Sequence, residues 1–286
     1  MNKAASIVIN LFIYVIALFV VIFTWQYIPD YHLLWKILIA DVIGTVVVFI
    51  FSVIFNNSSM YDPYWSVQPF VIAVFLAWPM QGVTLAEALV ILMVFLYGLR
   101  LTLNFYRGWP GMKHEDWRYQ DFRKSFPKLY WVVSFLGIHL FPTLMVFLAC
   151  MSMVQIFQGP GLQLDAWYIL GLITMIMAVG LAYIADEQMR KFRMKPENKG
   201  KLMRGGLWKY SRHPNYLGEI LTWWGLFFFS LSAGLDQWWM GVGALTVTIM
   251  FVFISIPMLE KRELKRRPEY EDYKKEVPML LPFKLG

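Results

Sequence analysis

Residues 5–28 read ASIVINLFIYVIALFVVIFTWQYI, a run without a single Asp, Glu, Lys or Arg. An apolar run of about 20 residues is long enough to cross the hydrocarbon core of a membrane as a helix. The run is longer than the apolar part of a signal peptide, about 7–15 residues, and no small-residue cleavage site follows it. We therefore predict a membrane helix at this position.

Seven further apolar runs lie near residues 33–55, 66–80, 84–106, 130–157, 166–187, 215–233 and 237–259. The 286-residue chain is 58% hydrophobic and 16% charged, which excludes a water-soluble globule. We predict an all-α, polytopic membrane helix bundle of about eight transmembrane helices. Seven is the alternative, because the run 66–80 is short and carries Pro69 and Pro79. The single cysteine, Cys150, excludes a disulfide framework.

The positive charges gather in three segments, residues 107–128, 188–213 and 260–286, which hold 23 of the 26 Lys and Arg residues. Threading eight spans places all three segments and both termini on one face, which the positive-inside rule makes cytoplasmic. The net charge of +7 is explained by this topology and by contact with membrane lipids. Neither a recognition helix nor zinc-finger spacing is present, so we expect no nucleic-acid partner.

The organisation predicted from these patterns is an amino-terminal helix pair, residues 1–58, followed by a larger membrane domain, residues 59–286, which carries the three basic segments. We expect a multi-pass integral membrane protein, in the inner membrane if the source is bacterial, and a monomer. The four histidines are scattered along the chain, so we predict no metal site. Asp41, inside the second run, is either the partner of another buried polar group or part of an interface.

Polar residues inside the apolar runs are candidate site residues, because an ionisable group facing lipid costs several kcal/mol. Tyr97, Arg100, Asn104 and Arg107 follow one another at steps of three, four and three, which places them on one stripe of a helix. Asp62 precedes the third run on the same side of the membrane, so a phenol and a carboxyl can meet there. Arg100 and Arg107 can also be explained by contact with headgroups, but this explanation does not include Asn104.

Two basic segments suggest anion binding. Asp186, Arg190 and Arg193 share a helix face that suits a nucleotide, although an ordinary basic helix end gives the same spacing. Residues 205–219 read GGLWKYSRHPNYLGE, in which a Gly-Gly loop leads through Arg212 and His213 into a helix started by Pro214. Cations and free N–H groups at a helix amino terminus form an anion site. Three polar and aromatic side chains continue this helix stripe into the membrane: Asn215, Glu219 and Trp223.

Several motifs carry a resemblance to a known family. They are RHPNYLGE at 212–219, EKR at 260–262, YEDY at 270–273 and LLPF at 280–283, with DPYWS at 62–66, YGLRL at 97–101 and EDWRY at 115–119 as looser matches. With them the chain resembles the steroid 5α-reductase superfamily, and within it a branch of bacterial membrane proteins. It is more distantly similar to sterol C14-reductases, which share the run RHPNYLG.

The resemblance implies a membrane reductase that uses NADPH to reduce a carbon–carbon double bond, conjugated to a ketone, in an apolar steroid- or isoprenoid-like lipid. It implies Tyr97 and Asp62 as catalytic residues at the carbonyl, where the steroid enzymes have a Gln-Glu pair. Trp65 and Trp223 are predicted to contact the substrate. The predicted cofactor-binding residues are Arg100, Asn104, Arg107, Arg118, Asp186, Arg190, Arg193, Arg212, His213, Asn215, Glu219 and Arg262.

Two other functions stay open on the sequence. Arg-His-Pro followed by an aromatic residue, Gly and an acidic tail also resembles isoprenylcysteine carboxyl methyltransferase and its bacterial relatives, which bind S-adenosylmethionine. A non-catalytic membrane scaffold or a transporter is the third possibility, although inverted repeats and broken helices are not visible.

Overall fold

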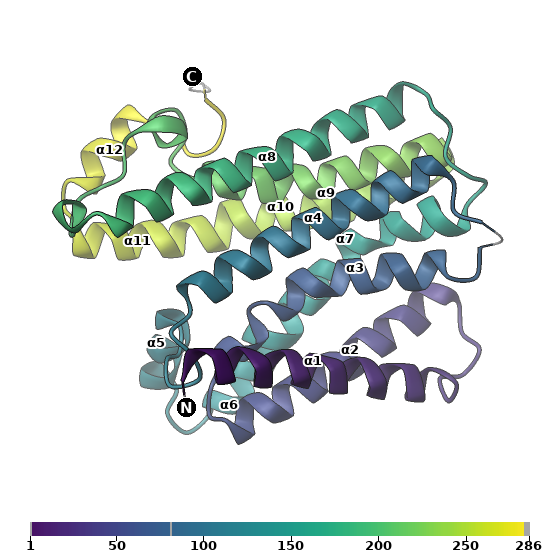
Figure 1. Ribbon diagram of the computed structural model, residues 1–286, viewed down its shortest axis with the longest axis horizontal. Helices are drawn as coiled ribbons and strands as arrows, with labels where there is room; N and C mark the ends of the chain where they lie inside the picture. The colour runs from purple at the N-terminus through teal and green to yellow at the C-terminus, as the bar shows by residue number, and fades with distance from the viewer. Residues whose placement is uncertain (1, 81, 283–286) are drawn as a thin grey trace. The chain divides into compact units, whose positions relative to one another are not determined.

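In the computed structural model, which describes residues 2–80 and 82–282, every apolar run predicted from the sequence is helical. Helices make up 79% of the described residues, which contain no strand. The all-α fold class is therefore confirmed. The α-helices are labelled in Figure 1. The elements are α1 (Lys3–Trp25), α2 (Leu33–Ile54), η1 (Ser58–Tyr61), α3 (Tyr64–Ala77), α4 (Leu85–Gly108), α5 (Trp117–Ser125), α6 (Tyr130–Val133), η2 (Ser134–Leu140), α7 (Phe141–Gln158), α8 (Ala166–Met194), η3 (Pro196–Asn198), η4 (Gly206–Lys209), α9 (Pro214–Ala233), η5 (Leu235–Met240), α10 (Gly241–Met250), η6 (Phe251–Ser255), α11 (Ile256–Arg266) and α12 (Tyr270–Glu276).

Six helical segments of the described chain are long and apolar enough to cross a membrane. They are Lys3–Trp25, Leu33–Ile54, Leu85–Gly108, Tyr130–Gln158, Ala166–Met194 and Leu235–Arg266. The 14 residues of α3 extend about 21 Å, less than the hydrocarbon thickness of about 30 Å. The chain is an integral membrane protein, and the prediction of eight crossings with both termini in the cytoplasm stays a prediction.

The chain divides into two compact units. The first comprises Met1–Val83 and Val94–Gln158, and the second comprises Thr84–Met93 and Gly159–Gly286, so that α4 contributes to both. The division predicted from the sequence, between residues 58 and 59, stays a prediction. Phe283, the last residue of the LLPF motif, lies outside the described residues.

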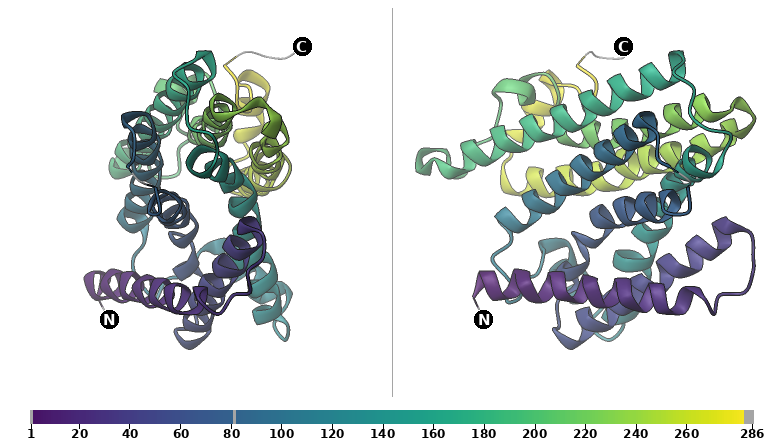
Figure 2. Two further views of the ribbon diagram at one scale, coloured as in Figure 1. Left: turned by 90° about the vertical axis from the view of Figure 1, so that its right-hand side faces the viewer. Right: turned by 45° about the vertical axis from the view of Figure 1, so that its right-hand side comes forward.

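In the first unit α1 and α2 lie side by side (Figure 2). Asn10 on α1 donates hydrogen bonds from Nδ2 to the hydroxyls of Tyr14, at 3.2 Å, and Tyr106, at 3.0 Å. The Tyr14 hydroxyl donates to the carbonyl oxygen of Met60 at 2.5 Å. All four residues are buried, and buried polar groups are stable only when they are hydrogen-bonded. These bonds hold α1 against α4 and against η1, the segment that leads to Asp62.

Asp41 has a buried partner in the first unit. The side-chain amide of Gln68 on α3 donates a hydrogen bond to Asp41 Oδ1 on α2, and both residues are buried. Of the two explanations open on the sequence, the structure therefore supports the pairing with another buried polar group. The pair ties α2 to α3, which begins two residues after Asp62.

In the second unit α8 and α9 pack closely along their length (Figure 1). The contact depends on small residues, because a Cβ atom at Gly218 would lie 2.6 Å from the carbonyl oxygen of Ala178 and 2.7 Å from the Cβ of Ala182. Glycine at such positions lets the backbones of two membrane helices approach. Gly218 belongs to the RHPNYLGE motif, so this part of the motif has a packing role.

We expect Gly218→Ala to destabilise the protein by about 1–3 kcal/mol, because the new methyl group would push against the backbone of α8. Gly180→Ala is the matched control, since nothing lies within 4 Å of a Cβ atom at this other helical glycine. Thermal unfolding in detergent measures both variants. Equal melting temperatures for the two would contradict the packing role of Gly218.

Candidate functional site

Asp62 lies between η1 and α3, and its carboxyl group faces the start of α5 in the first unit. The Tyr119 hydroxyl donates a hydrogen bond to Asp62 Oδ1, and the Arg118 guanidinium lies 3.6 Å from the same oxygen. The side chain of Asp62 is only 14% exposed. The carboxyl group therefore lies at the edge of the protein interior, with one phenol and one cation beside it.

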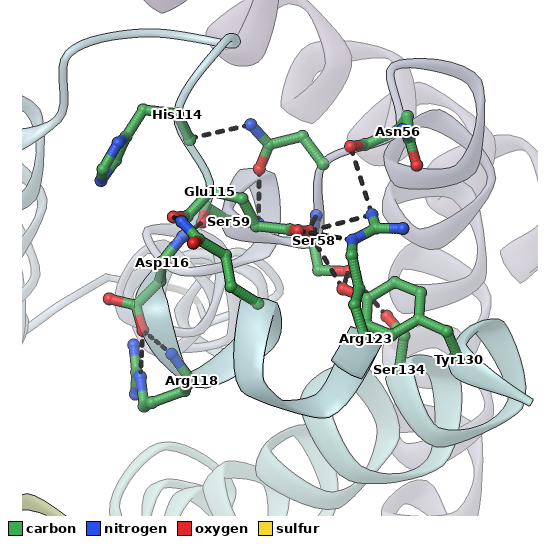
Figure 3. Close-up of polar contacts among 12 residues, drawn as sticks. Asn56, Ser58, Ser59, His114, Glu115, Asp116, Arg118, Arg123, Tyr130 and Ser134 are labelled. Carbon is green, nitrogen blue, oxygen red and sulfur yellow. Dashed lines mark hydrogen bonds and ion pairs between the residues drawn. The ribbon is translucent and has the colours of Figure 1, made fainter. Parts of the chain in front are cut away.

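The turn that carries Asp62 is fastened to the loop before α5 by a set of polar contacts (Figure 3). Asn57 donates from Nδ2 to the carbonyl oxygens of Met112, at 2.7 Å, and His114, at 3.0 Å. The backbone N–H of Asp116 donates to Ser59 Oγ at 2.7 Å. Because the residues that lead into Asp62 are bonded to this loop, the chain before Asp62 has a defined position relative to the start of α5.

Glu115 is the second centre of these contacts. It accepts hydrogen bonds from the backbone N–H of Ser58, at 2.8 Å, from the Tyr130 hydroxyl, at 3.0 Å, and from Arg123, at 2.6 Å and 3.1 Å (Figure 3). The Arg123 guanidinium also lies 3.8 Å from the centroid of the Tyr130 ring. A carboxylate with a two-point arginine contact and further donors is a strong anchor. Sequence reasoning assigned no role to Glu115, Tyr130 or Arg123.

Burial raises the pKa of Asp62 from its ordinary value of 3.8 to about 7. The positive charge of Arg118 and the hydrogen bond from Tyr119 act in the opposite direction, while the nearby carboxylates of Asp116 and Glu115 add to the increase. A carboxylic acid that is still protonated near neutral pH can donate a hydrogen bond or a proton. This property makes Asp62 a chemically capable residue and not only a structural one.

The predicted stripe on α4 passes from the buried interior to the surface. Tyr97 is 1% exposed, Arg100 is also buried, Asn104 is half-buried and Arg107 is exposed. The Arg100 guanidinium lies 6.0 Å from the centroid of the Tyr97 ring. At the outer end of the helix, the carbonyl oxygen of Arg107 accepts a hydrogen bond from Lys3 at 2.9 Å. The phenol of Tyr97 is therefore held in the interior of the first unit.

The contact between α3 and α4 brings the neighbours of Asp62 and Tyr97 together. A Cβ atom at Gly98 would lie 2.4 Å from the carbonyl oxygen of Ser66, so only glycine allows this approach. Ser66 Oγ donates to the carbonyl oxygen of Pro63, which follows Asp62, at 2.8 Å. The two predicted catalytic residues thus flank one contact. Trp65, the predicted substrate residue, is half-buried and packs on the core beside it.

In the second unit, Arg212 and His213 share one acceptor, Glu260 on α11. Arg212 Nε lies 2.8 Å, and His213 Nε2 2.9 Å, from Glu260 Oε1. All three residues are buried. The burial of His213 lowers its pKa, while the bond to Glu260 acts in the opposite direction. The sequence predicted that Arg212 and His213 bind the cofactor; in the structure both side chains face Glu260, and their part in cofactor binding stays a prediction.

The same arginine fastens the carboxyl-terminal segment. Arg212 Nη1 donates to the carbonyl oxygens of Lys274, at 3.1 Å, and Val277, at 2.5 Å. Its backbone N–H donates to the carbonyl oxygen of Pro278 at 3.0 Å. We call Arg212, His213 and Glu260, with these carbonyl groups, the Arg212 cluster. It holds the chain that follows α12 against the start of α9.

The end of α8 and the Gly-Gly loop lie together in the second unit. The backbone N–H of Leu207 donates to Gln188 Oε1 at 2.9 Å, and Trp208 Nε1 donates to the carbonyl oxygen of Ala185 at 3.1 Å. Gly206, at φ 59°, would bring a Cβ atom to within 2.5 Å of Gln188. The glycine therefore allows the loop to lie on the turn of α8 that carries Asp186.

The remaining predicted cofactor residues differ in exposure. Arg190 pairs with Glu187 at 2.6 Å, as expected for an ordinary helix end, and its side chain is 38% exposed. Arg193 is exposed, and Asp186, Asn215 and Arg262 are half-buried. Glu219 and Trp223 are buried along α9. Among the described residues, no group of three or more His, Cys, Asp or Glu side chains is placed to hold a metal ion.

Comparison with protein families extends over most of the chain. A family described as "Protein of unknown function (DUF1295)" matches residues 48–277. The chain belongs to this family. DUF1295 is the steroid 5α-reductase-like family, so the resemblance based on the RHPNYLGE and YEDY motifs is confirmed. The assignment of this DUF1295 chain to a bacterial branch stays a prediction.

Curated relatives of the DUF1295 chain fall into two kinds. An uncharacterized protein of Schizosaccharomyces pombe is 28% identical over 262 residues, which cover 81% of this chain and 74% of the relative. Human 3-oxo-5-alpha-steroid 4-dehydrogenase 2 is 29% identical over 128 residues, or 42% of this chain and 45% of the human protein. Human 3-oxo-5-alpha-steroid 4-dehydrogenase 1 is 31% identical over 99 residues, or 35% of each chain. The match thus spans less than half of either dehydrogenase. No solved structure matches the chain significantly.

Proposed function

We propose that this DUF1295 protein is a membrane reductase that uses NADPH to reduce a carbon–carbon double bond, conjugated to a ketone, in an apolar steroid- or isoprenoid-like lipid. The observation that carries the proposal is the Asp62 carboxyl group, with its pKa of about 7, on the same unit as the buried phenol of Tyr97. Two relatives named 3-oxo-5-alpha-steroid 4-dehydrogenases support the reaction class.

The side chains present suit NADPH. The exposed guanidinium groups of Arg190 and Arg193 can bind phosphates by charge-assisted hydrogen bonds. Asn215 and Glu219 lie one turn apart at the start of α9, where free backbone N–H groups favour an anion. In the second unit we also assign the half-buried Asp186 and Arg262 to the cofactor. The residues of the first unit that we assign to it are Arg118, Arg100, Asn104 and Arg107.

When bound, NADPH would supply the hydride that the β-carbon of the enone accepts, and protonation of the α-carbon completes the reduction. Tyr97 and protonated Asp62 donate hydrogen bonds to the ketone oxygen, where negative charge develops in the transition state. The interior position of Tyr97 keeps competing water away from this oxygen. We propose that Trp65 and Trp223 contact the apolar part of the substrate.

Thermal unfolding in detergent tests the cofactor. A ligand that binds only the folded state stabilises it by about 2.7 kcal/mol at 100 times its dissociation constant. We expect a rise in melting temperature with NADPH concentration and a smaller rise with NADH. Stabilisation by S-adenosylmethionine alone would instead support a methyltransferase, and no effect from any of the three would support a scaffold.

Incubation with membrane lipid extracts and NADPH tests the reaction. We expect the gain of two hydrogens in an enone lipid, detected by mass spectrometry, with one deuterium transferred when the cofactor carries deuterium at its hydride position. Conversion that persists without added NADPH would contradict the proposal.

A further inference from the structure

The two oxygens of the Asp62 carboxyl group are in different environments. Oδ1 accepts the hydrogen bond from Tyr119 and lies 3.6 Å from Arg118. Within residues 2–80 and 82–282, no hydrogen bond is made to Oδ2. The side chain is 14% exposed, so it is neither sealed in the core nor free at the surface. One oxygen is therefore held by the protein, and the other is available to a ligand.

The residues that hold Oδ1 are themselves oriented. Asp116 Oδ1 accepts from the backbone N–H of Arg118 at 2.9 Å, which caps the start of α5, and from Arg118 Nε at 2.7 Å. The Arg118 guanidinium lies 5.1 Å from the centroid of the Tyr119 ring, and Tyr119 is buried. The contact between Asp116 and Ser59 joins this end of α5 to η1. The direction of both side chains toward Asp62 is thus set by the fold.

Titratable groups lie on three sides of Asp62. Arg118, Tyr119, Asp116 and Glu115 face it from α5 and the preceding loop, Tyr61 from η1 and Tyr14 from α1. Of these, Arg118 and Tyr119 favour the ionised carboxylate, whereas the two acids oppose it. Removing either favourable partner must therefore raise the pKa of Asp62 further.

We propose that Tyr119 and Arg118 are positioning residues for Asp62: they hold Oδ1, so that the proton on Oδ2 is presented to the ketone oxygen of the substrate. The proposal rests on the proposed function, adds Tyr119 to it, and gives Arg118 a role beside Asp62 in addition to the one proposed at the cofactor. The proposal also places two motifs that lie far apart along the chain in one site, EDWRY at 115–119 and DPYWS at 62–66.

Infrared titration of the carboxyl band in purified protein, without cofactor, measures the protonation of Asp62 directly. The band is assigned from its loss in Asp62→Asn. We expect a midpoint near pH 7 in the natural protein. Arg118→Gln should move it upward by about one pH unit, and Tyr119→Phe should move it in the same direction. Tyr130→Phe is the matched control, because its hydroxyl contacts Glu115 and Ser58 and not Asp62.

The pH profile of enone reduction is the second measurement. Protonated Asp62 is the active form, so the rate should fall as pH rises through about 7. Both variants should move this decrease in rate to higher pH. An unchanged infrared midpoint in Arg118→Gln and Tyr119→Phe would overturn the positioning role. A shifted midpoint in a protein that reduces no enone would leave the positioning role intact and refute the proposed function alone. Arg118 is partly exposed, so we expect Arg118→Gln to fold. This variant therefore provides the test if Tyr119→Phe does not fold.

Discussion

Tyr97→Phe should lower the rate of NADPH-dependent enone reduction by about 10²–10³, the cost of losing one donor to a developing oxyanion. The substitution removes only a hydroxyl group, and Tyr97 is 1% exposed, so the ring keeps its packing. Charge accumulates on the ketone oxygen in the transition state, so the loss should appear in kcat. The melting-temperature rise produced by NADPH should stay unchanged.

Tyr106→Phe is the control for this experiment. Tyr106 is a buried tyrosine on the same helix, and its hydroxyl accepts a hydrogen bond from Asn10. This variant should lose some stability and keep its rate within a few-fold. If Tyr97→Phe retains full turnover with bound NADPH, Tyr97 has no catalytic role.

Glu260→Ala should lower the free energy of unfolding by about 3–5 kcal/mol, because it leaves Arg212 and His213 buried without their shared acceptor. The arginine also holds the chain after α12 through three hydrogen bonds to carbonyl groups. We therefore expect faster proteolysis and faster hydrogen exchange in residues 270–280 of the variant. Thermal unfolding in detergent gives the size of the effect.

Glu276→Ala provides the comparison, since it removes an ion pair with Arg204 in which both side chains are well exposed, at 42% and 61%. Such surface pairs contribute about 0–1 kcal/mol. Similar losses for the two variants would show that the Arg212 cluster does not hold the segment. A double variant, Arg212→Met with Glu260→Leu, removes both charges together and should recover part of the stability. If that double variant also keeps NADPH binding, Arg212 acts by positioning and does not contact the cofactor.

The membrane fold could be predicted from the sequence because lipid offers the backbone no partner outside a helix or a closed barrel. A run such as 5–28 therefore has one stable form. The same argument does not predict which type of helical turn forms at each position within a long apolar run. Residues 134–140 and 251–255 form π-helical turns within predicted spans, and apolar composition alone does not distinguish these turns from an α-helix.

The sequence also singled out Asp62, Tyr97, Arg212 and Glu219, since charged or polar groups beside apolar runs are costly unless they have a role. It identified Arg212 and His213 as a cationic pair at a helix start. It could not show that Glu260, 48 residues after Arg212, lies between them and shares the charge.

The sequence by itself determined the helical membrane architecture through its apolar runs, the family through the resemblance of its motifs, and the polar residues that are candidates for a site. Only the tertiary structure decided which of these residues meet: Tyr119 with Asp62, Gln68 with Asp41, and Arg212 with Glu260. The physical reason is the separation along the chain of the residues that interact. Helix formation in lipid depends on consecutive residues, whereas the protonation and direction of a carboxyl group depend on burial and on donors that other helices bring to it.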